Sequence, residues 1–149
     1  MPRFYRECRI KDKQELFLKV YQEEKAECSC VLRVCCIAAG YKEAPIYVSG
    51  KVVDGLGGGI CQITTTLYNA VLLSNLEIVE RSNHQFVPSY ANASRDATVV
   101  YGAIDFKFKN NREYPIKITC SVSKGIANFK IWGLKSDNDY EVVLSSRVT

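Results

Sequence analysis

The sequence predicts an α+β fold in which one central buried helix packs against an antiparallel sheet. Two observations carry this prediction. Apolar residues recur at helical spacing over about residues 60–75, and over about residues 98–145 they alternate with polar residues, as in strands with one wet face. A cluster of glycines directly before the helical stretch indicates a sharp turn into it.

The predicted helix has one apolar face, and Asn75 is suited to end it. That face consists of Ile60, Ile63, Leu67, Ala70, Val71 and Ser74. Before the glycines, a short strand is expected around Ile46 to Val48, with a turn at Ser49-Gly50.

The predicted sheet rests on three alternating runs separated by turn signals at Asn110-Asn111 and Lys124-Gly125. The inward-facing residues are Phe106 and Phe108 in the first run, Ile116, Ile118, Cys120 and Val122 in the second, and Phe129 and Ile131 in the third. These runs predict an antiparallel meander. Tyr140, Val142 and Leu144 are expected to add an edge strand.

The first 39 residues differ in character from the rest. A helix is predicted over about residues 13–25, because Asp12 can cap it and Leu16, Phe17, Val20 and Tyr21 share one face. Five of the seven cysteines lie in this segment, but with CxC and CC spacings and one histidine in the chain they do not suggest a zinc site. No metal is predicted. The chain is therefore divided into an atypical segment 1–39, whose cysteine-rich part has no assigned structure, and a domain 40–149.

Composition excludes several classes of protein. The chain has 149 residues with 47% hydrophobic and 24% charged residues, an ordinary balance for one globular domain. Its net charge of +4 is spread along the sequence without a basic run, which argues against a nucleic-acid partner. No apolar stretch approaches the roughly 18 residues of a membrane span. The printed N-terminus has basic residues but no apolar region behind them, so no export signal is predicted.

The glycine turn GLGGGICQ leads into the helix and places Cys61 in its first turn. It has neither the Lys-Ser/Thr ending of a P-loop nor the spacing of a dinucleotide fingerprint, and no cofactor is predicted. At this position the helix dipole and free amides favour a thiolate, the reactive form of cysteine. Amides of Gly58 and Gly59 can stabilise an oxyanion. Alternatively, Cys61 is only a small buried residue at a tight junction.

Polar residues follow Cys61 on the helix, which suggests a polar lining of a site. Gln62 and Thr65 are the candidates for substrate contact, within the run Thr64, Thr65 and Thr66. β-Branched residues lower helix propensity, so three in succession call for an explanation. The alternative is that these hydroxyls only bond to the preceding helical turn.

A thiol nucleophile needs a base, and His84 is the one histidine of the chain. Asp96 or Asp105 can orient its imidazole, and Asp96 is preferred because the adjacent Arg95 can bind a substrate carboxylate. The alternatives are an exposed loop histidine and a surface ion pair between Arg95 and Asp96. The predicted catalytic residues are thus Cys61, His84 and Asp96.

Two long strings resemble the VanW domain of bacterial cell-envelope proteins, a family named from a glycopeptide-resistance cluster. They are GYKEAPIYVSGKVVDGLGGGICQITTTLYNAVLLSNLEIVERSNHQF and SRDATVVYGAIDFKFKNNREYPIKI. The resemblance covers about Gly40 to Gly133. It implies a cell-envelope location and a peptidoglycan partner, with the family's cysteine at Cys61 and its histidine at His84.

The activity that the resemblance implies is L,D-transpeptidation, in which a cysteine forms 3-3 cross-links between stem peptides. A non-catalytic peptidoglycan-binding module and a thiol hydrolase remain the alternatives. The family's usual entry segment, with Pro-Gly-Glu, Phe-Ser and Gly-Pro-Arg-Thr, is absent from residues 1–39. This departure suggests a truncated or frame-altered chain, which translation of the upstream DNA in the other two frames would test.

Overall fold

The computed structural model describes residues 43–48, 50–100, 102–134 and 141–145, together with three short strands nearer the N-terminus. Within these residues it contains one helix, α1 (Ile60–Leu73). The strands are β1 (Arg6–Cys8), β2 (Leu18–Val20), β3 (Glu27–Ser29), β4 (Glu43–Val48), β5 (Lys51–Leu56), β6 (Glu77–Glu80), β7 (Lys107–Lys109), β8 (Lys117–Ser123) and β9 (Ile126–Trp132). The predicted α+β class is confirmed.

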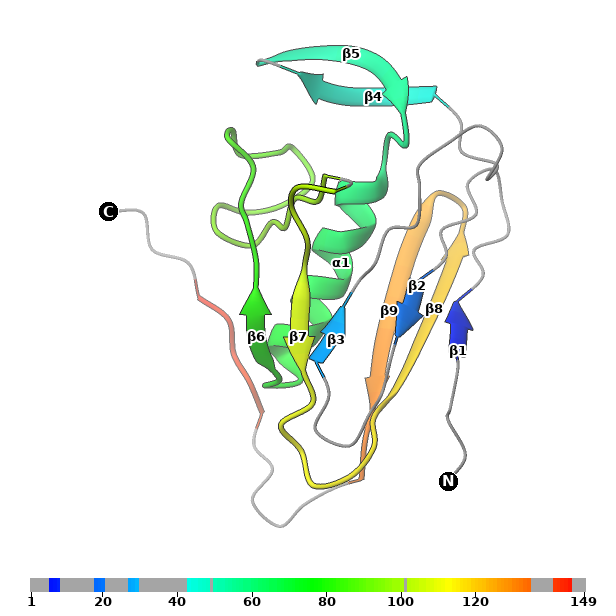
Figure 1. Ribbon diagram of the computed structural model, residues 1–149, viewed down its shortest axis with the longest axis vertical. Coiled ribbons are helices and arrows are strands. Elements are labelled where there is room, and N and C mark those ends of the chain that lie inside the picture. Colours follow the sequence, from blue (N-terminus) through cyan, green and yellow to red (C-terminus); the bar gives the residue numbers. More distant parts are fainter. Residues whose placement is uncertain are drawn as a thin grey trace.

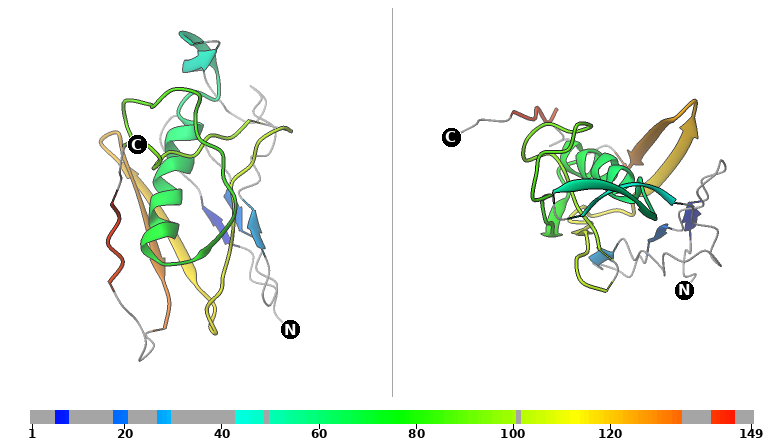
Figure 2. Two further views of the ribbon diagram at one scale, coloured as in Figure 1. Left: turned by 90° about the vertical axis from the view of Figure 1, so that its left-hand side faces the viewer. Right: turned by 90° about the horizontal axis from the view of Figure 1, so that it is seen from above.

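The strands form four small sheets, in the orders β1-β2, β3-β7-β6, β4-β5 and β8-β9. All of these pairings are antiparallel. Helix α1 runs between the β3-β7-β6 sheet and the β8-β9 hairpin, as both Figure 1 and Figure 2 show. The β4-β5 hairpin lies over the N-terminal end of α1 (Figure 1). In the part of the chain that the structure describes, no helix is long and apolar enough to cross a membrane.

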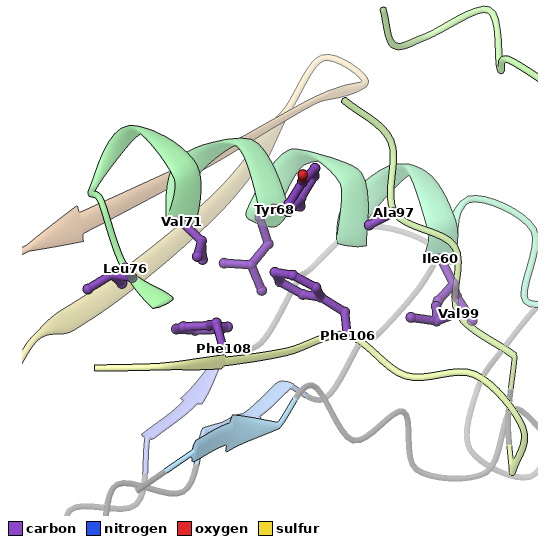
Figure 3. Packing of buried hydrophobic residues seen from close by; sticks show 9 residues of the cluster. Ile60, Tyr68, Val71, Leu76, Ala97, Val99, Phe106 and Phe108 are labelled. Carbon is purple, nitrogen blue, oxygen red and sulfur yellow. The ribbon is translucent and has the colours of Figure 1, made fainter. Parts of the chain in front are cut away.

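The core lies between α1 and the segment that leads through β7. Its largest fully buried side chains are Phe106, Phe108, Leu67 and Val71. The ring of Phe106 stacks on Phe108 at a centroid distance of 5.7 Å and meets Tyr68 edge to face at 5.5 Å (Figure 3). The β8-β9 hairpin adds half-buried Ile118, Phe129 and Ile131 to this cluster. The predicted inward face is therefore confirmed for Ile60, Ile63, Leu67 and Val71 of the helix. It is also confirmed for the strand residues other than Val122, whose side chain lies outside the described ones.

Backbone conformations at the two ends of α1 explain where it starts and stops. Gly59 caps the N-terminus with φ +90°, a left-handed conformation that glycine adopts without strain. At the other end Asn75 has φ +50°, and the Leu76 amide donates to the Val71 carbonyl. The prediction that Asn75 ends the helix is confirmed.

The turn between β8 and β9 is also as predicted. Lys124 and Gly125 both have positive φ, +51° and +77°, and they are the two residues between the paired ends Ser123 and Ile126. Two left-handed residues are the requirement of the two-residue turn whose twist matches that of a hairpin.

Two predicted elements are wrong. Leu18–Val20, inside the helix predicted over about residues 13–25, forms β2 and pairs with β1; the rest of that predicted helix lies outside the described residues. The hydrogen bonds between β1 and β2 outweigh the helical spacing of apolar residues, which extends over only a few residues here. The predicted edge strand is wrong as well. Residues 141–145, which include Val142 and Leu144, form no regular secondary structure. Tyr140 lies outside the described residues. Alternation of apolar and polar residues predicts which side chains would face the core, but it does not specify a neighbouring strand with which the segment would pair.

The sheet differs from a continuous meander in how its strands pair. Strand β7 pairs with β6 and β3, and not with β8, which follows it in sequence. Strands β1, β3, β5 and β6 were not predicted. In β6 the side chains of Ile78 and Glu80 are half-buried while Glu77 and Val79 are exposed, so the alternation is present but only four residues long.

Candidate active site

Cys61 is the second residue of α1 and is half-buried. Its Sγ lies 3.5 Å from the carbonyl oxygen of Val99 and 3.6 Å from Oγ1 of Thr98. The Ile63 amide makes the first bond of the helical ladder, to the Gly59 carbonyl. The amides of Cys61 and Gln62 precede that bond, at positions where a helix offers no internal acceptor, and no side chain caps this end. The sulfur of Cys61 and main-chain amides without an acceptor inside the helix therefore lie at the same end of α1.

The glycine turn brings the β4-β5 hairpin against this end of the helix. A Cβ placed on Gly58 would lie 2.4 Å from the Cβ of Ala44 and 2.6 Å from its main chain. Any larger residue at position 58 would therefore push the hairpin away. Gly57, with φ +80°, and Gly59 turn the chain from β5 into α1.

Asp96 is the centre of a buried polar cluster. Its Oδ2 accepts from the main-chain amide and from ring Nδ1 of His84, both at 2.6 Å. Its Oδ1 accepts from Nη2 of Arg81 at 3.0 Å, and Nε of Arg81 donates to the Asp96 carbonyl oxygen at 2.8 Å. Of the two candidates, Asp96 is the carboxylate that meets His84. The Asp105 carboxylate accepts from the amide of Phe106.

These contacts lower the pKa of Asp96. Burial acts in the opposite direction and would raise it, but the two hydrogen bonds from His84 and the positive charge of Arg81 outweigh burial. Asp96 is therefore ionised at neutral pH. An ionised carboxylate accepts a hydrogen bond from the N–H of Nδ1 of His84, which leaves the lone pair of the neutral imidazole on Nε2.

The other ring nitrogen of His84 meets Tyr90. The Tyr90 hydroxyl lies 3.2 Å from Nε2, and the two rings pack edge to face with centroids 6.1 Å apart. Since Nε2 is the acceptor in this tautomer, the phenol donates the hydrogen bond.

One extended segment connects the Cys61 site with the His84 site. Thr98 contacts Cys61, and its amide donates to the carbonyl of Ser82 at 2.8 Å, while Asp96, two residues earlier, binds His84. Two residues of extended chain span about 7 Å. Among the described residues, no hydrogen bond joins Cys61 to His84. The structure thus brings His84 and Asp96 together. Cys61 contacts the same segment at Thr98, two residues after Asp96.

Thr65 and Asn69 of α1 hold this segment against the helix. The Thr65 hydroxyl donates to the carbonyl of Ala97 and accepts from the amide of the same residue. The Asn69 amide group donates to the carbonyl of Arg95 at 2.8 Å. Thr65 is buried and hydrogen-bonded in both directions, so its hydroxyl fixes the chain that carries Asp96 and Thr98.

Of the other predicted contact residues, Gln62 lies in the first turn of α1 and Arg95 lies beside Asn69, farther along the helix. Thr64 and Thr66 donate to the carbonyls of Ile60 and Gln62 in the preceding turn, which is the alternative considered for the threonine run. The Gln62 side chain is exposed, and Arg95 is half-buried. Within the described ranges, no three His, Cys, Asp or Glu side chains converge to hold a metal ion.

Three residues of this cluster were missed in the sequence, namely Arg81, Tyr90 and Thr98. The pairing of Ser82 with Thr98 brings two separate segments together, and Arg81 reaches Asp96 across the same junction. A single sequence contains no signal for such a pairing. Tyr90 lies in an irregular loop, where periodicity gives no guidance.

Comparison with known proteins supports the resemblance noted in the sequence. The family described as VanW like protein matches residues 21–132, a range that begins within the segment set apart as atypical. An uncharacterized protein, YoaR of Bacillus subtilis (strain 168), is 49% identical over 79 residues, which are 53% of this chain and 26% of that protein. The vancomycin B-type resistance protein VanW of Enterococcus faecalis (strain ATCC 700802 / V583) is 32% identical over 91 residues, covering 56% of this chain and 33% of that protein.

The chain thus spans between a quarter and a third of the length of these two curated relatives. No solved structure matches it. Because the family match covers most of the chain, including the glycine turn, α1 and the segment with Asp96 and Thr98, the chain belongs to the VanW-like protein family.

Proposed function

We propose that this chain is a peptidoglycan-modifying cysteine acyl transferase of the L,D-transpeptidase type. The observation that carries the proposal is the position of Cys61, a half-buried thiol in the first turn of α1, beside the segment on which Asp96 binds His84. A nucleophile and oxyanion donors at the start of α1, with an oriented base held by the adjoining segment, are the arrangement that such a reaction needs.

The proposed reaction has two steps. The thiolate of Cys61 attacks the carbonyl of the third residue of a tetrapeptide stem, and a C–S bond replaces the C–N bond to the terminal D-Ala, whose amine leaves with a proton from His84. An amine of a neighbouring stem then attacks the thioester. The new amide forms the cross-link, its proton passes to His84, and the thiolate is regenerated.

Each neighbouring residue has a role in this proposal. Amides of Gly58, Gly59 and Cys61 stabilise the oxyanion, and Gln62 and Arg95 contact the substrate. Thr65 acts indirectly, because it fixes the segment that carries Asp96. Thr98 is a positioning residue that donates to the sulfur when Cys61 is ionised. Catalytic hydrogen bonds are often loose without substrate, so the ring of His84 is expected to approach Cys61 in the complex.

The family and the name of one relative favour a place in the cell envelope. That relative is named a vancomycin B-type resistance protein, and vancomycin resistance concerns the synthesis of the cell wall. We therefore propose peptidoglycan stem peptides as the partner and the outer side of the membrane as the location.

The test combines purified tetrapeptide muropeptides with the protein and follows dimer formation. Wild type is expected to form 3-3 linked dimers and, early in the reaction, an acyl adduct on Cys61 that mass spectrometry locates. Cys61→Ser should abolish both, while Cys120→Ser, which changes a half-buried cysteine of β8, should retain both. Equal activity of Cys61→Ser and wild type would refute the enzymatic role.

A second candidate function is a non-catalytic peptidoglycan-binding module. It is favoured by the contacts of the two reactive groups, because Sγ of Cys61 meets the Val99 carbonyl and Nε2 of His84 meets Tyr90. This candidate predicts that wild type and Cys61→Ser bind muropeptides equally and that neither forms dimers. A hydrolase would instead release the acyl group to water, which appears as tripeptide product without dimers.

A further inference from the structure

Nε2 of His84 is the atom that would take up the proton of Cys61, and in the structure it is already engaged. Asp96 holds Nδ1 at 2.6 Å, which leaves the lone pair on Nε2, and the Tyr90 hydroxyl lies 3.2 Å from that atom. The imidazole can accept one strong hydrogen bond at Nε2. The thiol of Cys61 and the phenol of Tyr90 are therefore competitors for it.

The two partners of His84 differ in how far they are exposed to solvent. Asp96 is 4% exposed and is also bound by Arg81, so this side of the imidazole is fixed. Tyr90 is 37% exposed and is the third residue of a turn in which the Ala91 amide donates to the Pro88 carbonyl. A partly exposed hydroxyl can exchange its hydrogen bond to His84 for one to water.

The thiol of Cys61 also has an alternative partner, because it meets the Val99 carbonyl at 3.5 Å. Both reactive groups are therefore satisfied separately, the sulfur by a main-chain oxygen and the imidazole by Tyr90. In this arrangement each member of the proposed catalytic pair is bound to a group other than its proposed partner.

We infer that Tyr90 is a positioning residue whose hydrogen bond occupies Nε2 of His84. Substrate must displace the Tyr90 hydroxyl before His84 can accept the proton of Cys61. The inference rests on the proposed function, since it takes His84 as the base. It adds a residue and a step, namely the displacement of Tyr90 when a stem peptide binds across the His84 loop.

The test uses Tyr90→Phe in the full chain, because this change removes the hydroxyl and keeps the ring that packs on His84. His84 is the one histidine of the sequence, so its ring nitrogens give a single set of ¹⁵N signals. In Tyr90→Phe the Nε2 signal should move towards that of an imidazole nitrogen without a hydrogen bond, and the Nδ1 signal should stay. Tyr114→Phe, which changes an exposed tyrosine away from the site, is the matched control.

A second readout is the rate at which iodoacetamide alkylates Cys61, followed on the peptide that contains it. Release of Nε2 should raise this rate about two- to tenfold, the range expected for the loss of one competing neutral hydrogen bond. The increase should vanish when Tyr90→Phe is combined with His84→Gln. A residue that merely oriented His84 would give the opposite result, a slower reaction.

An unchanged Nε2 signal in Tyr90→Phe, or an alkylation rate that does not rise, overturns the inference. Neither measurement requires peptidoglycan. Failure of the proposed function would appear separately, as the absence of a Cys61 acyl adduct in wild type with muropeptides.

Discussion

Asp96 is the residue on which the polar contacts of the site converge. It accepts two hydrogen bonds from His84 and one from Arg81 while 4% exposed, and Arg81 also lies over the ring of Tyr68 with its guanidinium carbon 5.3 Å from the centroid. One carboxylate thus joins the loop of His84, the end of β6 and the core. Removing its charge should affect stability as well as any catalysis.

The lowered pKa of Asp96 predicts how stability depends on pH. Because this pKa lies below the ordinary value of 3.8 in the folded protein, the ionised carboxylate stabilises the fold at neutral pH. That contribution is retained above the ordinary value and is lost as the pH falls below 3.8 through the folded-state pKa. Urea unfolding at pH 7 should show Asp96→Asn to be less stable by about 1–3 kcal/mol.

The same variant should lose less of its remaining stability than wild type between neutral and acidic pH. Asp54→Asn, an exposed change in β5, serves as control and should follow the wild-type profile. Parallel acid profiles of wild type and Asp96→Asn would contradict the assignment of this linkage to Asp96.

At the scale of elements, α1 and the β8-β9 hairpin could be predicted because their signals are local. The helix has apolar spacing over four turns with a left-handed residue at each end, and the hairpin has Lys124-Gly125 at its turn. Strands β5 and β6 could not be recognised because they are short or largely exposed. Which strands pair was also beyond the sequence, since β7 chooses partners distant along the chain.

The residues of the candidate site likewise fall into those with a local signal in the sequence and those whose contacts depend on the fold. Cys61 and His84 are conspicuous as a cysteine at the start of a helix and the sole histidine. The meeting of His84 with Asp96 was one of two alternatives, and it depends on the pairing of Ser82 with Thr98. Arg81 and Thr98 acquire their contacts from that pairing, and Tyr90 meets His84 within a loop that has no periodicity, so no local pattern marks these residues.

The link between α1 and the segment with Asp96 can be tested with Thr65→Val. This nearly isosteric change leaves the amide and carbonyl of Ala97 without their buried partner, which should cost about 1–3 kcal/mol of unfolding free energy in urea. The matched variant Thr66→Val removes a hydroxyl that bonds within the helix and should cost much less. Equal losses in the two variants would contradict the role assigned to Thr65.

The packing of the β4-β5 hairpin on the glycine turn predicts the effect of Gly58→Ala. Its methyl group would lie 2.4 Å from the Cβ of Ala44, so the hairpin must shift, at a cost of about 1–3 kcal/mol in thermal or urea unfolding. Gly133→Ala is the control, because a Cβ there would lie 3.9 Å from Ile116. Should both glycines tolerate alanine equally, the close approach at Gly58 would be refuted.

At the scale of the whole molecule, the core extends along all of α1 and reaches the candidate site. Val71, Leu76 and Phe108 pack around the C-terminal half of the helix (Figure 3). At its N-terminal end Ile60 and Val99 belong to the same cluster, and Cys61 packs against it. Packing in the core therefore also holds the end of α1 that carries Cys61.

Phe108→Ala tests how much this core contributes to stability, because Phe108 is fully buried. The cavity should lower the unfolding free energy by about 3–5 kcal/mol, measured by urea titration. Phe86→Ala, at a side chain that is 58% exposed, should change it by about 0.5 kcal/mol or less. A similar loss in both variants would show that Phe108 does not anchor the fold.

The pairing of β3 with β7 has a consequence for how the chain is made. Cys28 pairs with Phe108, and their positions differ by 80 residues, 108 minus 28. A ribosome adds residues from the N-terminus, so β3 leaves the exit tunnel well before its partner exists. Its main-chain groups stay exposed until β7 has been made, and a chaperone that shields extended segments should raise the yield of native protein.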